Sequence, residues 1–136
     1  MKGYDTKNKL NDYSLLNVGD GGIYATARDL NKWEQALNSG KFIKKESLEK
    51  VYSTVVLTNG RTRRYGYGWE IGSNSQGKLV YHSGEIAGFR TYVESQLASN
   101  NTVIILTNNS FLKVAQLRNT LVKILDGRLV ALPVEK

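Results

Sequence analysis

The chain has 136 residues, of which 40% are hydrophobic and 23% are charged. This balance is typical of one globular domain and argues against disorder. The sequence has no cysteine, which excludes disulfides and thiolate zinc sites, and its single histidine, His82, cannot form a histidine cluster. We therefore expect no metal and no cofactor. Apolar runs such as residues 103–106 are far shorter than the roughly 18 residues of a membrane span, so none is expected.

The net charge of +7 raises the question of an anionic partner. However, the basic residues of the middle of the chain lie in polar or turn-like segments, where a solvated surface is the simpler interpretation: Lys41, Lys44, Lys45, Arg61, Arg63 and Arg64. We therefore expect no nucleic acid partner.

The first half of the chain predicts an N-terminal arm and two helices. Residues 1–20 are polar and aperiodic and lead into a glycine-rich loop. Thr26 followed by Asp29 resembles a capping box, and apolar residues then recur at helical spacing, which predicts a helix over about 27–38. A second, shorter helix is predicted to begin at Glu46 or Ser47.

The second half predicts a sheet and a final helix. The glycine-spaced segment 65–71 is predicted as a strand with Tyr65, Tyr67 and Trp69 on one core-facing side, followed by a loop over 72–77. Further strands are predicted over 79–83, 89–97 and 102–107, and an amphipathic helix over 112–126, capped by Ser110.

Strands joined by short turns and flanked by helices predict an α+β fold with an antiparallel sheet of three to four strands. Residues 1–136 are expected to form a single domain. It would consist of the arm, a helical part over 21–58, and the sheet plus the C-terminal helix over 65–126. We expect the 112–126 helix to cover one face of the sheet and the two earlier helices to belong to an adjoining helical region.

Several segments resemble, in order, signatures of the serine β-lactamase and penicillin-binding-protein family. Residues 21–30, Gly-Gly-Ile-Tyr-Ala-Thr-Ala-Arg-Asp-Leu, resemble its glycine-rich helix start, and residues 65–69 its aromatic strand. His82-Ser83-Gly84 stands where the family has Lys-Thr/Ser-Gly, as in its His-x-Gly members. Shorter matches are Gly3-Tyr4, Gly88-Phe89-Arg90 and Leu106-Thr107-Asn108. The resemblance covers residues 3 to about 125 and implies the C-terminal half of such an enzyme, a partial β-lactamase/transpeptidase-like fold.

The resemblance also implies roles for the third motif. His82 would project into the substrate groove, and Ser83 would offer its hydroxyl to a carboxylate or amide of the substrate. Gly84 would let the substrate backbone lie against the strand, and the Glu85 backbone N–H would be an oxyanion donor. Histidine, unlike lysine, is mostly neutral near pH 7, which shifts the implied activity toward an esterase or peptidase without excluding β-lactam recognition.

The family's nucleophile lies in a Ser-x-x-Lys motif, which should precede residue 1. The pattern occurs here three times, at Ser47, Ser75 and Ser110, always after the glycine-rich helix start and so in the wrong order. Residues 99–101 imitate the second motif, Ser-x-Asn, but are typical of a turn. We therefore expect no complete catalytic site in this chain, and whether it is itself an enzyme stays open.

The implied partners are the missing N-terminal half of the parent enzyme and a peptide, ester or β-lactam-like substrate. The resemblance implies an extracytoplasmic or cell-envelope location for the parent, while the chain itself indicates no compartment. The apolar strand 102–107 predicts a homodimer through its unpaired edge or through exchange of arm 1–20, the alternative being a monomer whose arm covers the edge. Two other functions stay open: a standalone binding or interaction module without chemistry and, less favoured, a basic nucleic-acid binder.

Overall fold

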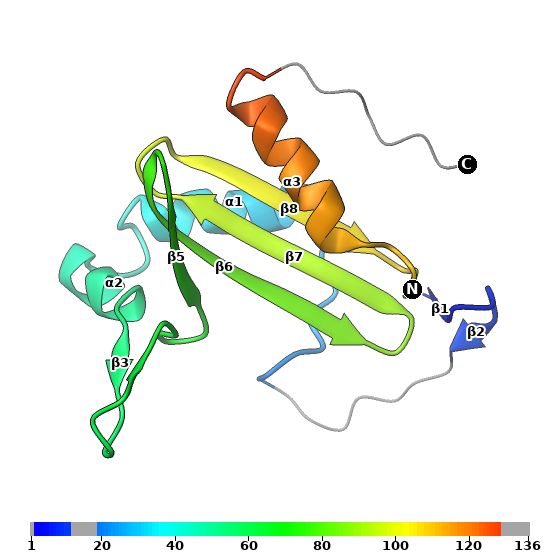
Figure 1. The fold of residues 1–136 in the computed structure, drawn as a ribbon, viewed down its shortest axis with the longest axis horizontal. Coiled ribbons are helices and arrows are strands. Elements are labelled where there is room, and N and C mark those ends of the chain that lie inside the picture. Colours follow the sequence, from blue (N-terminus) through cyan, green and yellow to red (C-terminus); the bar gives the residue numbers. More distant parts are fainter. Residues whose placement is uncertain (1, 12–18, 129–136) are drawn as a thin grey trace.

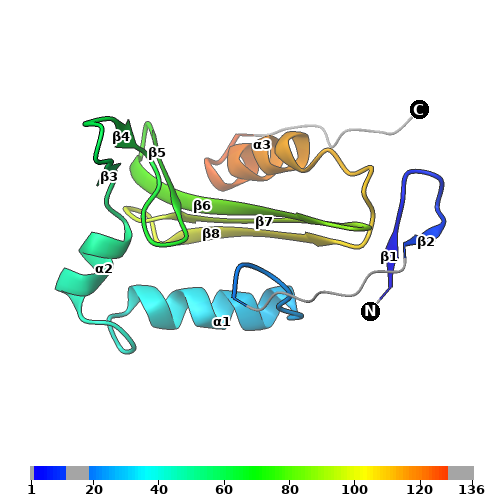
Figure 2. The ribbon, with the colours of Figure 1, turned by 90° about the horizontal axis from the view of Figure 1, so that it is seen from below.

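The structure, a computed structural model, describes residues 2–11 and 19–128. Its centre is an antiparallel sheet in the order β5 (Glu70–Asn74), β6 (Gly77–Ile86), β7 (Phe89–Gln96) and β8 (Asn101–Thr107). Helix α1 (Ala27–Asn38) lies on one face and α3 (Val114–Leu125) on the other, as Figures 1 and 2 show together. The predicted α+β class with an antiparallel sheet is thus confirmed.

Three small elements lie at the ends of this sandwich. Strands β1 (Gly3–Tyr4) and β2 (Leu10–Asn11) form a hairpin near the C-terminal end of β8. Helix α2 (Lys45–Val51) and a second hairpin, β3 (Val55–Val56) with β4 (Thr62–Arg63), lie together at the opposite end, as both views show (Figures 1 and 2). The predicted arm over 1–20 lies partly outside the described residues.

Helix α1 begins as its sequence predicts. The Asp29 backbone N–H donates to the Thr26 hydroxyl oxygen over 3.1 Å, and that hydroxyl donates to the Asp29 carboxylate over 2.7 Å. This is a capping box in which the shorter Asp side chain reaches the hydroxyl. The helix buries Leu37 against Val80 in a core that Tyr52 and Trp69 complete. Each such apolar side chain contributes about 1.5–3 kcal/mol on full burial.

A polar contact in this interface joins α1 to the sheet. Glu34 of α1 and Ser95 of β7 are both fully buried, and the Ser95 hydroxyl donates to Glu34 Oε2. Asn38 Nδ2 also donates to Oε2, over 3.5 Å, while Oε1 has no hydrogen-bond partner among the described residues. Burial raises the pKa of Glu34, against the lowering effect of the hydrogen bonds from Ser95 and Asn38.

Glu94, the residue before Ser95 in β7, joins α3 to the opposite face of the sheet. Glu94 is fully buried and receives hydrogen bonds from Arg118 of α3, with Nε to Oε2 at 2.8 Å, and from the Tyr92 hydroxyl at 2.8 Å. The Arg118 Nη2 atom lies 2.6 Å from the same oxygen. Burial, together with the Glu94 carboxylate, raises the pKa of Tyr92. A buried carboxylate paired with a guanidinium in this way fixes the position of α3.

The prediction that both early helices belong to an adjoining helical region is wrong for α1. Its buried residues, Glu34 and Leu37, contact the sheet, so α1 is one layer of the sandwich. An amphipathic pattern predicts that a helix has a buried face but not which element covers that face.

The aromatic segment 65–69 is not a strand, contrary to the prediction. Here the Gly66 N–H donates to the Trp69 carbonyl over 2.7 Å, which closes a tight turn around Gly68 at φ +81°. Tyr67 is therefore 73% exposed while Trp69 is 6% exposed, so the aromatic rings do not share one core-facing side. Strand β5 begins only at Glu70 and runs through part of the predicted loop over 72–77.

The prediction that Ser110 caps the last helix is wrong. The helix begins after Lys113, without a side-chain cap, and the Ser110 hydroxyl donates instead to the Tyr4 carbonyl over 3.1 Å. Tyr4 also donates its N–H to the carbonyls of Asn108 at 2.9 Å and Gly88 at 3.3 Å. The described part of the arm thus docks at the end of the sheet and does not run along the edge of β8 over 102–107.

Glu34 predicts an unusual pH dependence of stability. Because folding raises its pKa, its contribution is fully present below the unfolded value and is lost as pH rises through the folded value. Relative to Glu34→Gln, which stays neutral, the wild type should lose unfolding free energy as pH rises above the range in which a glutamate of the unfolded chain titrates. Urea unfolding followed by tryptophan fluorescence measures this difference. Glu49→Gln, at an exposed site on α2, is the matched control, and a Glu34→Gln difference that is constant with pH would contradict the prediction.

Candidate active site

The candidate site lies where strand β6 extends beyond its neighbour β5. Their pairing ends at Glu70 with Tyr81, whereas β6 continues to Ile86 and stays paired with β7. Residues 82–86 therefore have one open edge within the described part of the chain. This segment contains all four residues that sequence analysis assigned to the third motif.

The register shows which backbone groups point to that open edge. The two-residue turn Ala87-Gly88 requires Ile86 and Phe89 to be a hydrogen-bonded pair. Hydrogen-bonded and non-hydrogen-bonded pairs alternate along an antiparallel ladder, so Ser83 and Glu85 direct their N–H and C=O groups away from β7. The structure therefore places the Glu85 N–H on the open edge, without a backbone partner among the described residues.

The side chains of the motif alternate between the two faces of the sheet. His82 and Gly84 are on the α1 face, whereas Ser83 and Glu85 are on the α3 face, as their cross-strand partners require. The structure therefore does not bring His82 and Ser83 into one cavity. The two side chains lie on opposite faces of β6, with the open edge of that strand between them.

His82 has a partner that sequence analysis did not identify. The Tyr65 hydroxyl lies 3.0 Å from His82 Nε2, and the two rings meet edge to face at 5.9 Å. Tyr65 reaches this position because its segment bends back onto the start of β5, where it forms a bridge with Glu70. No periodicity could indicate this contact, because it joins residues 17 positions apart across a glycine-rich turn.

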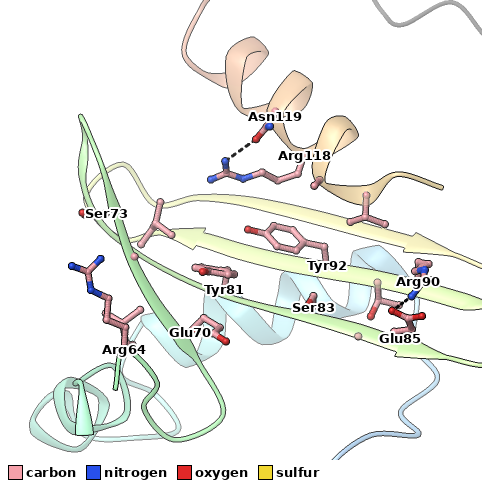
Figure 3. A pocket seen from close by; sticks show the side chains of 17 residues that line it. Arg64, Glu70, Ser73, Tyr81, Ser83, Glu85, Arg90, Tyr92, Arg118 and Asn119 are labelled. Atoms are coloured by element: carbon pink, nitrogen blue, oxygen red, sulfur yellow. Dashed lines mark hydrogen bonds and ion pairs between the residues drawn. The ribbon is translucent and has the colours of Figure 1, made fainter. Parts of the chain in front are cut away.

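On the α3 face, Ser83 lines an open depression of about 730 Å³ between the sheet and α3 (Figure 3). Glu85 and Arg90 lie at one end of it and form an ion pair, and Arg64 lies at the other. Arg118 and Asn119 line the depression on its α3 side, opposite the sheet. Arg118 Nη1 donates there to Asn119 Oδ1 over 3.0 Å. The exposed Ser83 hydroxyl is thus accessible beside charged groups of both signs.

Gly84 is required by packing as well as by any ligand. A Cβ atom added to Gly84 would lie 2.4 Å from Oγ1 of Thr91, its cross-strand partner on the α1 face. A substitution would thus force the Thr91 hydroxyl to move, in the middle of the motif. The contact with Thr91 alone is a reason for glycine at position 84. The expected contact with a substrate backbone would be a second reason.

The structure brings the glycine-rich helix start next to the end of the third motif. The Tyr24 and Phe89 rings meet edge to face at 6.3 Å, and a Cβ atom on Gly21 would lie 3.4 Å from Ile86 Cδ1. Two segments about 60 residues apart in the printed sequence, 21–26 and 82–90, thus form one region at this end of the sheet.

The three Ser-x-x-Lys matches lie in unrelated places. Ser47 is exposed in the first turn of α2, Ser75 is in the turn between β5 and β6, and Ser110 binds Tyr4. Among the described residues, no hydrogen bond joins any of these serines to the lysine that follows it, and none of the three lines the depression next to Ser83. No group of three or more metal-binding side chains occurs in the described ranges. No helix there is long and apolar enough to cross a bilayer.

Comparison with known proteins places the chain in a family. The sequence profile of the family described as Beta-lactamase matches residues 2–126. "Penicillin-binding protein 4*" of Bacillus subtilis (strain 168) is 38% identical over 91 residues, which are 66% of this chain and 20% of that protein. "Putative penicillin-binding protein PbpX" of the same strain is 32% identical over 117 residues, which are 85% of this chain and 27% of that protein.

The matched regions thus span about a fifth to a quarter of the length of these relatives. The profile match includes the glycine-rich helix start, the aromatic turn, the His82-Ser83-Gly84 segment and the last strand. The chain belongs to the Beta-lactamase family.

Proposed function

We propose that this chain supplies the substrate-binding strand and one oxyanion donor of a serine hydrolase of the Beta-lactamase family. The observation that carries the proposal is the open edge of β6, where the Glu85 N–H points away from the sheet between the side chains of His82 and Ser83. A backbone N–H held rigidly by a strand is suited to stabilise the oxyanion that develops during acyl transfer.

In this proposal the substrate lies along the β6 edge as an additional strand. The outward N–H and C=O groups of Ser83 would bind its backbone, which is the interaction used when a peptide extends a sheet. The Ser83 hydroxyl would contact a substrate carboxylate or amide from the α3 side. A peptide, ester or β-lactam-like molecule offers both the carbonyl and the polar groups that these donors require.

His82 would act from the α1 side with Tyr65 as its positioning residue. A phenol hydroxyl is a good donor, and a neutral imidazole has one nitrogen that accepts a hydrogen bond. If Tyr65 donates to Nε2, the ring is held as the Nδ1–H tautomer, which presents a neutral donor where the family has lysine. This supports a preference for ester or amide substrates over those bound through a carboxylate.

We further propose that the nucleophile and its base come from sequence outside residues 1–136, in an N-terminal half of the parent enzyme. The support is the unsuitable placement of Ser47, Ser75 and Ser110 and the small share of the relatives that the chain matches. An alternative is a standalone module that binds peptides at the β6 edge without chemistry. Binding of an extended peptide without any hydrolase activity in the parent protein would favour that alternative.

A last part of the proposal concerns the outer edge of β8. The same register argument places the outward N–H and C=O groups on Thr102, Ile104 and Leu106, and no strand pairs with them among the described residues. In the parent, we propose that the N-terminal half covers this edge. In the isolated chain, a second copy would do so, by antiparallel pairing of 102–107 or by exchange of the arm.

The proposal predicts that the isolated chain has no serine-hydrolase turnover. A fluorophosphonate probe should leave it unlabelled and a chromogenic β-lactam should be hydrolysed no faster than in buffer, because none of Ser47, Ser75 and Ser110 is hydrogen-bonded to a base among the described residues. Intact-mass spectrometry and absorbance measure the two results. Labelling of Ser47, Ser75 or Ser110, abolished by replacing that serine with alanine, would refute the proposal.

The tautomer of His82 is a second prediction. It is the single histidine of the chain, so nitrogen-15 NMR reports its ring without ambiguity. The wild type should show the Nδ1–H form, and Tyr65→Phe should shift the population toward Nε2–H because the donor to Nε2 is lost. Tyr67→Phe, a nearby tyrosine that is 73% exposed, should leave the ring signals unchanged. A wild-type ring in the Nε2–H form would contradict the assigned direction of the hydrogen bond.

Edge pairing of β8 is a third prediction, tested by sedimentation velocity at increasing concentration. The wild type should dimerise, and Leu106→Pro should be monomeric because it removes one outward N–H while leaving the inward bonds to β7 in place. Leu106→Ser keeps that N–H and is the matched control, which should still dimerise. A wild type that stays monomeric at high micromolar concentration would rule out this association.

A further inference from the structure

The positive charge of the molecule is concentrated in one segment. Residues 41–64 contain seven basic and two acidic residues, a net charge of +5 out of +7 for the whole chain. We call this segment the basic end. It comprises the loop after α1, helix α2 and the β3–β4 hairpin, and its basic residues are Lys41, Lys44, Lys45, Lys50, Arg61, Arg63 and Arg64.

The basic end projects beyond the sheet and does not cover either of its faces. Figures 1 and 2 both show α2 and the β3–β4 hairpin beyond the end of the sheet, opposite the β1–β2 hairpin. All seven cations are exposed, and none forms an ion pair with another described residue. The charges are thus free to act on an external partner.

Large apolar side chains are exposed among these cations. Phe42 is 68% exposed and Val56 is 66% exposed, and both residues of β3 have exposed side chains. Leu57, at the turn of the hairpin, is 37% exposed. The hairpin therefore combines an apolar strand, β3, with a strand and turn that carry three arginines, at Arg61, Arg63 and Arg64.

We propose that the basic end is a contact surface for an anionic lipid bilayer. Cations within a Debye length of an anionic leaflet are attracted to it, and apolar side chains beside them insert at the boundary between headgroups and acyl chains. A soluble polyanion would use the cations but would leave Phe42 and Val56 in water. The combination of both kinds of side chain on one projecting end therefore favours the bilayer.

This surface does not include the β6 edge, although its Arg64 also lies at the far end of the depression that Ser83 lines. None of the four motif residues, 82–85, belongs to it, so the proposal does not depend on the proposed hydrolase function. Attachment by this end would hold the domain at the bilayer with the β1–β2 hairpin farthest from it (Figure 1).

The test is co-sedimentation of the whole chain with vesicles of phosphatidylcholine, with and without a minority of phosphatidylglycerol. The chain should bind the anionic vesicles and not the neutral ones, and binding should weaken as salt is raised. Arg61→Glu with Arg63→Glu should weaken binding by roughly 25-fold or more, since each cation near an anionic leaflet contributes about fivefold.

Two matched variants distinguish this surface from general electrostatic attraction. Lys7→Glu with Lys9→Glu makes the same change in net charge in the exposed turn between β1 and β2, and should reduce binding by less than about threefold. Val56→Ser leaves every charge in place and should reduce binding by roughly tenfold because one apolar side chain no longer inserts. Circular dichroism checks that each variant is folded.

Three results would overturn the proposal. The first is no binding to anionic vesicles at low salt. The second is an equal loss in the Lys7 and Lys9 variant, which would indicate attraction by net charge alone. The third is full binding by Val56→Ser together with complete competition by inorganic polyphosphate, which would assign the basic end to a soluble polyanion.

Discussion

The layers of this domain depend on two consecutive residues at the centre of its sheet. Glu94 and Ser95 of β7 point to opposite faces, and both are fully buried. Glu94 binds Arg118 of α3, and Ser95 binds Glu34 of α1. Removing one partner of a buried polar pair leaves the other unsatisfied, which costs about 1–3 kcal/mol and more where that group is charged. One strand thus fixes the position of both helices against the sheet.

The candidate site depends in turn on the register of that sheet. A slip of one residue between β6 and β7 would turn the Glu85 N–H inward and exchange the faces of His82 and Ser83. The turn that sets this register contains Gly88 at φ +80°, where an added Cβ would lie 2.5 Å from backbone atoms of Gly3 and Tyr4. Only glycine fits between the turn and the N-terminal arm. The arm therefore helps to hold the motif in register although it is far from it in sequence.

The elements that could be predicted from the sequence are those whose determinants are close together in the chain. The helix over 27–38 has a cap, a period and an end within a dozen residues, and its observed bounds, Ala27–Asn38, agree with the prediction. The strands around His82 were also located, because short turns separate them. One error was local, because a tight turn between Gly66 and Trp69 replaces the start of the predicted strand. The other errors arose where distant segments meet. Three contacts join residues that are distant in sequence, so no local pattern could predict them. They are the hydrogen bonds of Tyr65 with His82, of Ser95 with Glu34 of α1, and of Ser110 with the Tyr4 carbonyl.

The exposed apolar residues on the α1 side show why the β6 edge is more informative than the depression in Figure 3. Ile23 is 87% exposed and Tyr24 is 66% exposed, in the segment that contacts the β6–β7 turn. The depression, by contrast, lies on the α3 side, where Arg64, Glu85, Arg90 and Arg118 are among the residues that line it. Exposed apolar patches of this kind mark surfaces that another structure covers. The α1 side next to His82 is therefore where we expect the proposed N-terminal half to pack, which would make the open edge of β6 the floor of a groove closed from that side.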